Sequence, residues 1–379
     1  MELNSLLTQM IEMKASDLHL VAGVPPIFRV DGELAPDRVP ASSPEGQDLS
    51  EDTVQLLLRR KGLQSRWKNR HPNLTGDDVH ALLRSTLPEP KLAAAREGRD
   101  FSATLRHDDQ TFRCQVFRSG GALAAAVRVL PKRIPSLDEM HLPPIFEKMT
   151  HLRRGLVLVV GPTGSGKTTT VVSMLEQINM TRSERIYTLE DPLNYVLGSK
   201  LSLVTQRVVG EDVESYESGL HAIKDADPDV VFIGELRSPE VVRLALELAE
   251  AGILVFSQVT VGTVSDAVER LIGLVDGPPN AARRLVARTL QAVIAQRLLV
   301  RADRSGRIAA NEILLSTAQT RQMISDGQTA PNLLALVMSA SRSIGMQTMD
   351  DALLDYYTDG VISRETAEEH LKDRTRLPG

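Results

Sequence analysis

The chain has 379 residues and a net charge of −5, and 42% of its residues are hydrophobic and 3% aromatic. This length predicts two domains, because it exceeds what one compact core usually holds. The acidic balance and the few aromatic side chains argue against a general nucleic-acid binder. The single cysteine, Cys114, excludes an internal disulfide and a cysteine-rich zinc site. No apolar run approaches the ~20 residues that cross a bilayer, so we expect a cytoplasmic protein.

The N-terminal third alternates short apolar runs with turns, which predicts a small sheet domain with flanking helices. The expected strands are Leu18–Val21, Pro26–Val30, Phe101–Leu105, Thr111–Phe117 and Ala122–Leu130. Asp31-Gly32 has the composition of a hairpin turn. A polar loop, Pro40–Asp52, leads into a basic stretch, Arg59–Asn73. That stretch either contacts an acidic partner or a lipid surface, or is a solvated insertion.

A linker with several prolines, Pro131–Pro144, precedes the second part of the chain. From Ile145 onward apolar strands alternate with helical patterns, which predicts a mostly parallel sheet with right-handed crossovers. The expected strands are Leu156–Val160, Ile186–Leu189, Val230–Ile233 and Ile253–Val259. The expected helices are Lys167–Asn179, Ser215–Lys224, Pro239–Glu250 and Ala281–Gln296. After Arg301 the chain is predicted to be largely helical, ending with Gln347–Tyr357 and Ser363–Lys372.

The segment between the first of these strands and the helix after it reads GPTGSGKTTT, which has the spacing of a phosphate-binding P-loop. Its glycines let successive backbone N–H groups turn inward at the positive end of a helix and hold a polyphosphate. Lys167 is expected to reach the β- and γ-phosphates, and the Thr168 hydroxyl to bind Mg²⁺. The motif therefore predicts that the chain binds a nucleoside triphosphate. The predicted nucleotide-binding residues are Gly161, Pro162, Thr163, Gly164, Ser165, Gly166, Lys167, Thr168 and Thr169.

Carboxylates follow two of the later strands, at the edge where open α/β sheets bind ligands. Glu190 and Asp191 come directly after the second expected strand and suit Mg²⁺ or the positioning of a water. A turn cap is the alternative role for them. Glu235 follows the third expected strand, where a base can deprotonate the water that attacks the γ-phosphate; a plain surface glutamate is the alternative. Gly234 occupies the usual place of a metal-binding Walker-B aspartate, so Glu190 or Asp191 is the carboxylate available for the metal.

Several motifs together resemble those of the PilT retraction-ATPase branch of the type II/IV secretion ATPases. In chain order they read ASDLHLVAGVPPIFRVDGEL, VVGPTGSGKTTT, YTLEDPLNYV, QRVVG, DPDVVFIGELR, RLALELAEAG and IGMQTMDDAL. The resemblance covers nearly the whole chain and departs mainly at Ala41–Asp78, which has the character of an insertion. Related extension and secretion ATPases usually carry a four-cysteine zinc element, and its absence here favours the retraction-type branch.

The resemblance implies a PAS-like N-terminal domain over residues 1–134 and a RecA-like P-loop ATPase core over 135–300. It implies a helical C-terminal part of the ATPase domain over 301–379, and a ring of six identical subunits. The cofactors that it implies are ATP and Mg²⁺. The implied location is peripheral, at the inner face of the cytoplasmic membrane, where the partner is an inner-membrane pilus platform protein. No nucleic acid is expected as a partner.

The resemblance also assigns roles to the polar residues of the second domain. It places Lys167 on the phosphates and Thr168 on Mg²⁺. Glu190 and Asp191 correspond to the family's Asp box, with a catalytic and a metal-binding role. Glu235 corresponds to the Walker-B catalytic glutamate.

Arginines of the N-terminal domain are implied to reach the γ-phosphate of a neighbouring subunit, as arginine fingers do. Arg113, in FRCQVF, and Arg128, in AVRVL, align with two of the family's arginines. A third family arginine falls on Gly121, with Arg118 as a nearby substitute.

The larger departure lies in the family's His box, which reads G-H-L-V-F-x-T-L-H-T. This chain reads GILVFSQVTV over 252–261, so Ile253 and Thr260 replace both histidines. No histidine lies between His221 and His370, and therefore none is close in sequence to take over. We expect the chain to bind Mg-ATP well and to hydrolyse it slowly, unless Gln258 or Thr260 compensates by hydrogen bonding.

Two functions follow from these residues. The first is a retraction motor, supported by the intact P-loop and carboxylates. The second is an ATP-gated accessory subunit that regulates or co-assembles with an active retraction ATPase paralogue, supported by the missing histidines and by the eroded C-terminal motif at Gln319–Asp326. A nucleic-acid translocase of the same superfamily is disfavoured by the acidic balance.

Overall fold

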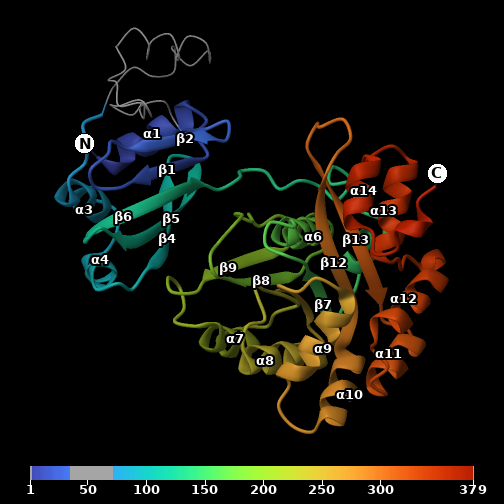
Figure 1. Ribbon diagram of the computed structural model, residues 1–379. Helices are drawn as coiled ribbons and strands as arrows, with labels where there is room; N and C mark the ends of the chain where they lie inside the picture. The colour runs from blue at the N-terminus through green and yellow to red at the C-terminus, as the bar shows by residue number, and fades with distance from the viewer. Residues whose placement is uncertain (1, 35–70, 379) are drawn as a thin grey trace. The chain divides into compact units, whose positions relative to one another are not determined.

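The computed structural model of the chain describes residues 2–34 and 71–378, which form two units (Figure 1). The first unit holds the described residues up to Lys132 together with Pro192–Val196, and the second holds Arg133–Asp191 and the chain from Leu197 onward. The polar loop Pro40–Asp52 and nearly all of the basic stretch Arg59–Asn73 lie outside the described residues. The same is true of most of the insertion expected at 41–78.

The first unit is built on an antiparallel sheet with the strand order β3-β2-β1-β6-β5-β4. Its strands are β1 (Asp17–Leu20), β2 (Ile27–Val30), β3 (Glu33–Leu34), β4 (Phe101–His107), β5 (Gln110–Ser119) and β6 (Ala122–Val129). Its described helices are α1 (Leu3–Glu12), α3 (Gly76–Arg84) and α4 (Glu89–Arg96). All five strands expected here from the sequence are present, each within about two residues of its expected ends.

The two faces of this sheet differ because side chains alternate along each strand. Phe112, Cys114 and Val116 of β5 are fully buried in a core that also contains residues of α1, α3 and α4. The residues between them, Arg113 and Gln115, lie on the opposite face and are half-buried. One face of the sheet is therefore apolar and covered by helices, and the other is polar.

The second unit contains a seven-stranded sheet with the order β13-β12-β7-β11-β10-β8-β9. Its strands are β7 (Gly155–Val160), β8 (Arg185–Glu190), β9 (Leu203–Val208), β10 (Val230–Ile233), β11 (Leu254–Val259), β12 (Leu290–Val300) and β13 (Arg307–Leu315). Its helices up to the last strands are α5 (Ile145–Thr150), α6 (Lys167–Thr181), α7 (Tyr216–Lys224), α8 (Pro239–Glu250), α9 (Val264–Leu274) and α10 (Pro279–Thr289). The C-terminal helices are α11 (Ala318–Ser325), α12 (Pro331–Ala340), η1 (Arg342–Ile344), α13 (Met349–Thr358), α14 (Arg364–His370) and η2 (Arg374–Arg376).

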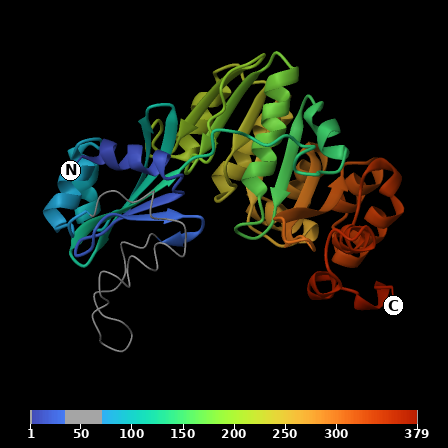
Figure 2. The same cartoon turned by 90° about the horizontal axis from the view of Figure 1, so that it is seen from above.

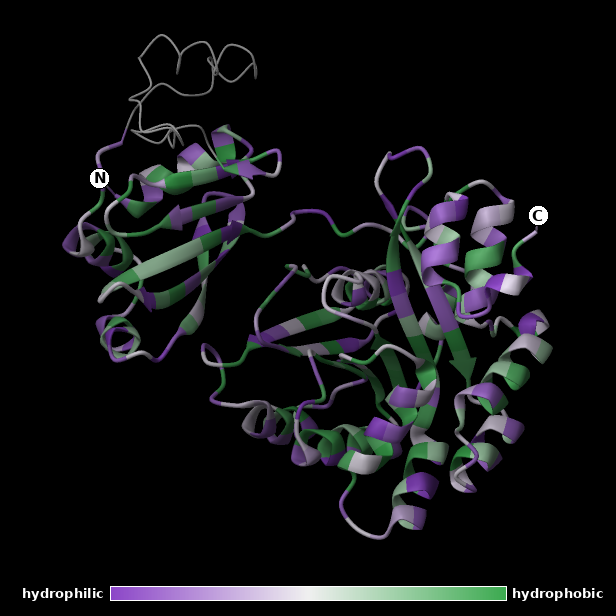
Figure 3. Ribbon diagram, viewed as in Figure 1, coloured by the Kyte–Doolittle hydropathy of each residue, from purple (hydrophilic) through white to green (hydrophobic). Residues whose placement is uncertain are grey.

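Neighbouring strands of this sheet run parallel except β12 and β13, which are antiparallel. Every residue of β7, β10 and β11 is buried, as expected for a parallel sheet covered on both faces. Helices α7 to α10 pack on one face, and α6 lies on the other (Figures 1 and 2). These helices carry both apolar and polar residues (Figure 3), because each has one buried side. The predicted fold class, an α+β sheet domain followed by an α/β domain, is confirmed.

Two expectations for the C-terminal part were wrong. The helix expected over Ala281–Gln296 ends at Thr289, and the chain continues directly as strand β12. The segment after Arg301 is not helical throughout, since Arg307–Leu315 forms β13. No glycine or proline separates α10 from β12, and the apolar run of β12 fits a buried helix and a buried strand equally well by pattern. Pairing with β7 and β13 decides between them.

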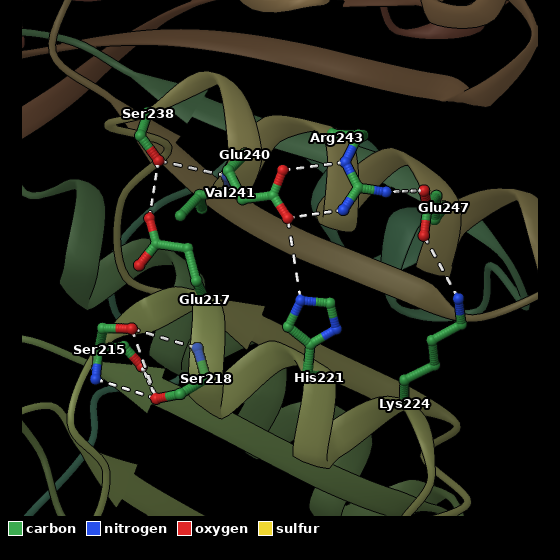
Figure 4. A network of polar contacts seen from close by, with 10 residues as sticks. All are labelled: Ser215, Glu217, Ser218, His221, Lys224, Ser238, Glu240, Val241, Arg243 and Glu247. Atoms are coloured by element: carbon green, nitrogen blue, oxygen red, sulfur yellow. Dashed lines mark hydrogen bonds and ion pairs between the residues drawn. The ribbon is translucent and has the colours of Figure 1, made fainter.

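The exposed sides of α7 and α8 are joined by polar contacts (Figure 4). Lys224 of α7 lies 3.3 Å from Glu247 of α8. Ser238 caps α8 by accepting a hydrogen bond from the backbone N–H of Val241 (3.3 Å), and it donates to Glu217 of α7 (2.9 Å). Exposed ion pairs contribute at most about 1 kcal/mol each. The start of α8, which follows the loop after β10, is held instead by the two hydrogen bonds of Ser238.

Candidate functional site

The predicted P-loop connects the end of β7 to the start of α6. Residues 161–166 form the loop, and 167–169 are the first three residues of the helix. Gly161, Gly164 and Gly166 have φ angles of 151°, 82° and 86°. Residues that carry a Cβ rarely adopt such backbone angles. A Cβ on Gly161 would lie only 2.3 Å from the backbone oxygen of Gln296. The loop therefore needs glycine for its conformation and for the close approach of β12.

Lys167 folds back over this loop. Its Nζ donates to the backbone oxygens of Gly161 (2.8 Å) and Pro162 (3.0 Å). Burial lowers the pKa of Lys167, and the negative charge of Glu235 partly opposes that effect. The ammonium is thus held at the loop, in reach of a phosphate that the loop would bind.

Gln296 fixes the loop from the neighbouring strand β12. Its Oε1 accepts a hydrogen bond from Thr170 of α6 (2.8 Å), and its Nε2 donates to the backbone oxygen of Ser165 (2.6 Å). The side chain is 1% exposed, and both ends of its amide have partners. This role of Gln296 was not predicted, because the residue had been expected at the end of a helix that in fact stops at Thr289.

Glu190 and Asp191, the predicted metal-binding carboxylates, differ in their surroundings. Glu190 is 2% exposed and accepts hydrogen bonds from Thr188 (2.8 Å) and Gln206 (3.2 Å). Asp191 is more exposed and forms an ion pair with Arg237 (3.2 Å). Glu190 is thus a buried carboxylate with two hydrogen-bond donors, whereas Asp191 is paired with a cation.

Glu235 lies at the end of β10 with its carboxylate between two donors. Thr260 donates to Oε1 (3.0 Å), and Arg237 donates to Oε2 (2.9 Å). Burial acts to raise the pKa of this carboxyl, but the hydrogen bonds from Arg237 and Thr260 and the charges of Arg237 and Lys167 outweigh it and lower the pKa. The group is therefore ionised at neutral pH, as a general base must be.

The two positions that lack the family's histidines lie at opposite ends of β11. Thr260 follows the strand's carboxyl end and contacts Glu235. Ile253 precedes the strand, and its backbone oxygen accepts from Gly155 at the start of β7 (3.0 Å). A strand rises about 3.3 Å per residue, so roughly 20 Å separates them. Only Thr260 belongs to the edge that carries the P-loop, so the loss of a histidine at 253 does not bear directly on the phosphate site.

A pocket of about 530 Å³ opens beside the P-loop. It is lined by Pro162–Ser165, Thr260–Gly262, Arg297–Leu299 and His370. Arg297 and His370 were not predicted. Arg297 lies in the strand that had been expected to be helical, and His370 is distant in sequence but is brought to the pocket by the C-terminal helices.

Three buried polar atoms near this edge have no hydrogen-bond partner among the described residues: Ser165 Oγ, Tyr216 Oη and Gln258 Nε2. Buried donors without acceptors are rare in folded proteins, and a bound phosphate would supply acceptors. Within the described ranges no group of three or more histidine, cysteine or acidic side chains could hold a metal by itself. Mg²⁺ normally binds one or two protein oxygens together with phosphate oxygens, so Thr168 and the P-loop fit Mg²⁺ that arrives with a nucleotide.

The predicted arginine fingers belong to the first unit, whereas the P-loop and the carboxylates belong to the second. Arg113 and Arg128 are directly opposite each other on β5 and β6, on the polar face of the sheet. Arg128 donates to Asp17 (2.7 Å), and Arg113 donates to Asn194 (3.2 Å). Like charges at opposed positions destabilise a sheet, and the carboxylate of Asp17 offsets that effect at Arg128. Gly121 lies in the β5–β6 turn with a φ of 84°, and Arg118 is near the end of β5 and exposed.

Comparison with known proteins gives consistent similarities. Residues 125–329 match the protein family described as Type II/IV secretion system protein. The chain is 33% identical over 380 residues to the type IV pilus retractation ATPase PilT of Pseudomonas aeruginosa, covering 98% of each chain. It is 32% identical over 378 residues to the type IV pilus ATPase PilU of the same organism, covering 100% of this chain and 90% of that one. The crystal structure of the pilus retraction motor PilT with bound ADP is similar over 100% of this chain and 99% of the other, with 35% identity and a TM-score of 0.80. In the part of the chain that the structure describes, no helix is long and apolar enough to cross a membrane.

Proposed function

Since this chain belongs to the PilT-like type II/IV secretion ATPases, we propose that it is a ring-forming motor subunit that hydrolyses ATP to drive retraction of a type IV pilus. The observation that carries the proposal is the juxtaposition at one sheet edge of a complete P-loop, Lys167, Thr168 and an ionised Glu235. These are the groups that phosphoryl transfer to water requires: a cradle for the phosphates, a cation on them and a base for the water.

In the proposed reaction the P-loop backbone and Lys167 hold the triphosphate, and the Thr168 hydroxyl would hold Mg²⁺. Mg²⁺ supplies positive charge that neutralises the phosphate oxygens. Glu235 accepts a proton from the attacking water, and its two hydrogen-bond donors keep the carboxylate ionised and oriented. Glu190 and Asp191 orient the water or the ion from the end of β8.

Arg113 and Arg128 are proposed to complete the site of a neighbouring subunit, which requires a closed ring; we propose six subunits. Two guanidinium groups opposed on adjacent strands favour a ligand with several negative charges, as a γ-phosphate has. The relatives that carry pilus names support a pilus machine as the place of action. We propose that the ring works at the inner face of the cytoplasmic membrane against an inner-membrane platform protein.

A second function is favoured by one observation, the neutral Thr260 beside Glu235 where the family pattern has a histidine. A hydroxyl already engaged by Glu235 stabilises developing charge less than an imidazole donor would. We therefore hold as the alternative an ATP-gated accessory subunit that binds nucleotide, hydrolyses it slowly and co-assembles with an active retraction ATPase.

Phosphate release from the purified full-length chain, alone and mixed with an active PilT, separates the two. The motor predicts steady turnover by the chain alone. The accessory subunit predicts only slow turnover alone and, in the mixture, a rate that differs from the sum of the two proteins measured separately. Light scattering in the presence of an ATP analogue is expected to give six times the subunit mass of 41.5 kDa. A monomer under all nucleotide conditions contradicts both functions, because a monomer offers the trans arginines no neighbouring phosphate to bind.

A further inference from the structure

The two strands that flank β7 each place a buried glutamine against the P-loop and its helix. Gln296 comes from β12 and Gln258 from β11, and their exposed fractions are 1% and 5%. Gln296 has partners at both ends of its amide, as described above. Gln258 accepts a hydrogen bond from Thr168 through Oε1 (3.2 Å), but its Nε2 contacts no acceptor in residues 2–34 and 71–378. The two glutamines thus differ in hydrogen bonding: both ends of the Gln296 amide have partners, whereas only one end of the Gln258 amide does.

The difference indicates two different roles. A fully bonded buried amide holds structure together, and its partners are all part of the loop or the helix. A buried N–H without an acceptor is costly, and a native site keeps one where an acceptor arrives later. Next to a P-loop threonine, the acceptor that arrives is a phosphate oxygen or a water bound to it.

Gln258 is also connected to the catalytic side of the site. Its backbone oxygen accepts a hydrogen bond from the N–H of Leu236 (3.1 Å), the residue after Glu235. Two residues further on, Thr260 donates to Glu235 itself (3.0 Å). A shift of Gln258 therefore moves atoms bonded to both the P-loop helix and the loop that carries the base.

We propose that Gln258 senses the γ-phosphate. In the free protein its amide oxygen holds the Thr168 hydroxyl. When a nucleotide with Mg²⁺ draws that hydroxyl away, the amide N–H becomes a donor to the γ-phosphate or to the attacking water. A diphosphate offers no such acceptor, so the residue favours triphosphates and links their presence to Glu235. This inference rests on the proposed binding and hydrolysis of ATP at this site.

The test compares the affinities for Mg-ATPγS and Mg-ADP by calorimetry on the full-length protein. Gln258→Met keeps the volume of the side chain and removes the N–H donor. The affinity for ATPγS is expected to fall about tenfold, because one hydrogen bond to a charged group is lost, and the affinity for ADP is expected to stay unchanged. The matched control is Gln296→Met on the other flanking strand. It is expected to weaken both nucleotides equally and to lower the melting temperature.

Gln258→Glu is a second variant that retains the acceptor for Thr168 and turns a negative charge toward the γ-phosphate. It is expected to weaken ATPγS binding more than Gln258→Met does, with ADP less affected. Equal losses for ATPγS and ADP in both Gln258 variants, or no loss in either, overturn the inference. If the parent hydrolyses ATP but the Gln258 variants still prefer ATPγS over ADP as the parent does, the role of Gln258 is refuted and the proposed motor stands. If the parent does not hydrolyse ATP but the Gln258 variants lose the preference for ATPγS over ADP, the proposed motor is refuted and the role of Gln258 is supported.

Discussion

The neighbouring strands β7 and β11 are paired residue by residue, from Gly155 opposite Leu254 to Val160 opposite Val259, yet their carboxyl ends use different chemistry. β7 ends in a loop that offers backbone groups, shaped by glycines at positive φ. β11 ends in side chains: Gln258 contacts Thr168, and Thr260 contacts Glu235.

The comparison shows why nucleotide binding and turnover can diverge in one chain. A phosphate cradle made of backbone N–H groups depends on chain conformation, so it persists as long as its glycines do. An edge made of side chains changes its chemistry with each substitution, as threonine in place of histidine does at 260. Binding common to diphosphates and triphosphates is therefore assigned to the β7 end, and hydrolysis rate to the side chains at the ends of β10 and β11; four substitutions test that assignment.

The largest effect is expected for Lys167→Ala at the β7 end. The change removes the cation held at the loop by Gly161 and Pro162, and kcat/KM for ATP should fall by about three orders of magnitude, the upper range for loss of one preorganised donor. Nucleotide titration and phosphate release measure it. Lys200→Ala is the matched control, because Lys200 is an exposed lysine of the same unit that pairs with Glu176. Unchanged nucleotide affinity in Lys167→Ala would show that the loop is not the binding site.

Glu235→Gln, at the end of β10, is expected to separate hydrolysis from nucleotide binding. The amide keeps the size of the side chain but cannot take a proton, so turnover should fall about a hundredfold, the lower range for a general base. ATP affinity should stay within about threefold of the parent, since the P-loop is untouched. Single-turnover phosphate release and an equilibrium titration on the same preparation check both statements. A loss of affinity as large as the loss of turnover would contradict the division between the strands.

A smaller effect in the opposite direction is expected for Thr260→His. An imidazole donor beside Glu235 should raise turnover about tenfold, provided that the pocket accepts the ring. Ile253→His is the matched control, because it introduces the same residue at the other end of β11, remote from the P-loop. A rise in both variants, or only in Ile253→His, would refute the view that position 260 alone belongs to the catalytic edge.

The sequence predicted the β7 end better than the β11 end for a physical reason. A P-loop is a local motif, so Gly161–Thr169 could be recognised without knowing the fold. The partners of that loop come from strands far away in sequence, and Gln296 and Arg297 were missed because nothing local marks the change from α10 to β12. His370 reaches the pocket only through the packing of the C-terminal helices.

The predicted strand Ile253–Val259 separates positions 253 and 260, because only Thr260 follows its carboxyl end. A seven-residue spacing has no fixed meaning until it is known to be a strand, in which case its ends lie at opposite edges of the sheet. In a helix the same spacing would have placed both residues on one face. The strand itself was predicted, but its functional consequence depends on which edge carries the P-loop.

The smallest effect is expected for Arg237→Gln and concerns pH. Burial raises the pKa of Glu235, and Arg237, with Thr260 and Lys167, lowers it below the usual value for a glutamate. A base with a lowered pKa remains active as the pH falls, and it stops only when it takes up a proton. Removal of Arg237 takes away a donor and a positive charge, so the pKa of Glu235 rises and the acid limb of the turnover profile moves to higher pH.

Turnover against pH, from neutral to acid, measures that shift, with circular dichroism to confirm that the protein stays folded. Arg243→Gln is the matched control, since Arg243 forms its ion pairs with Glu240 and Glu247 on the surface of α8 (Figure 4). Its profile should match that of the parent. Arg237 also pairs with Asp191, so Asp191→Asn is measured beside it. If Asp191→Asn abolished the acid limb while Arg237→Gln left it in place, the titrating group would be the carboxylate at the end of β8, and the base would have to be reassigned from β10 to β8.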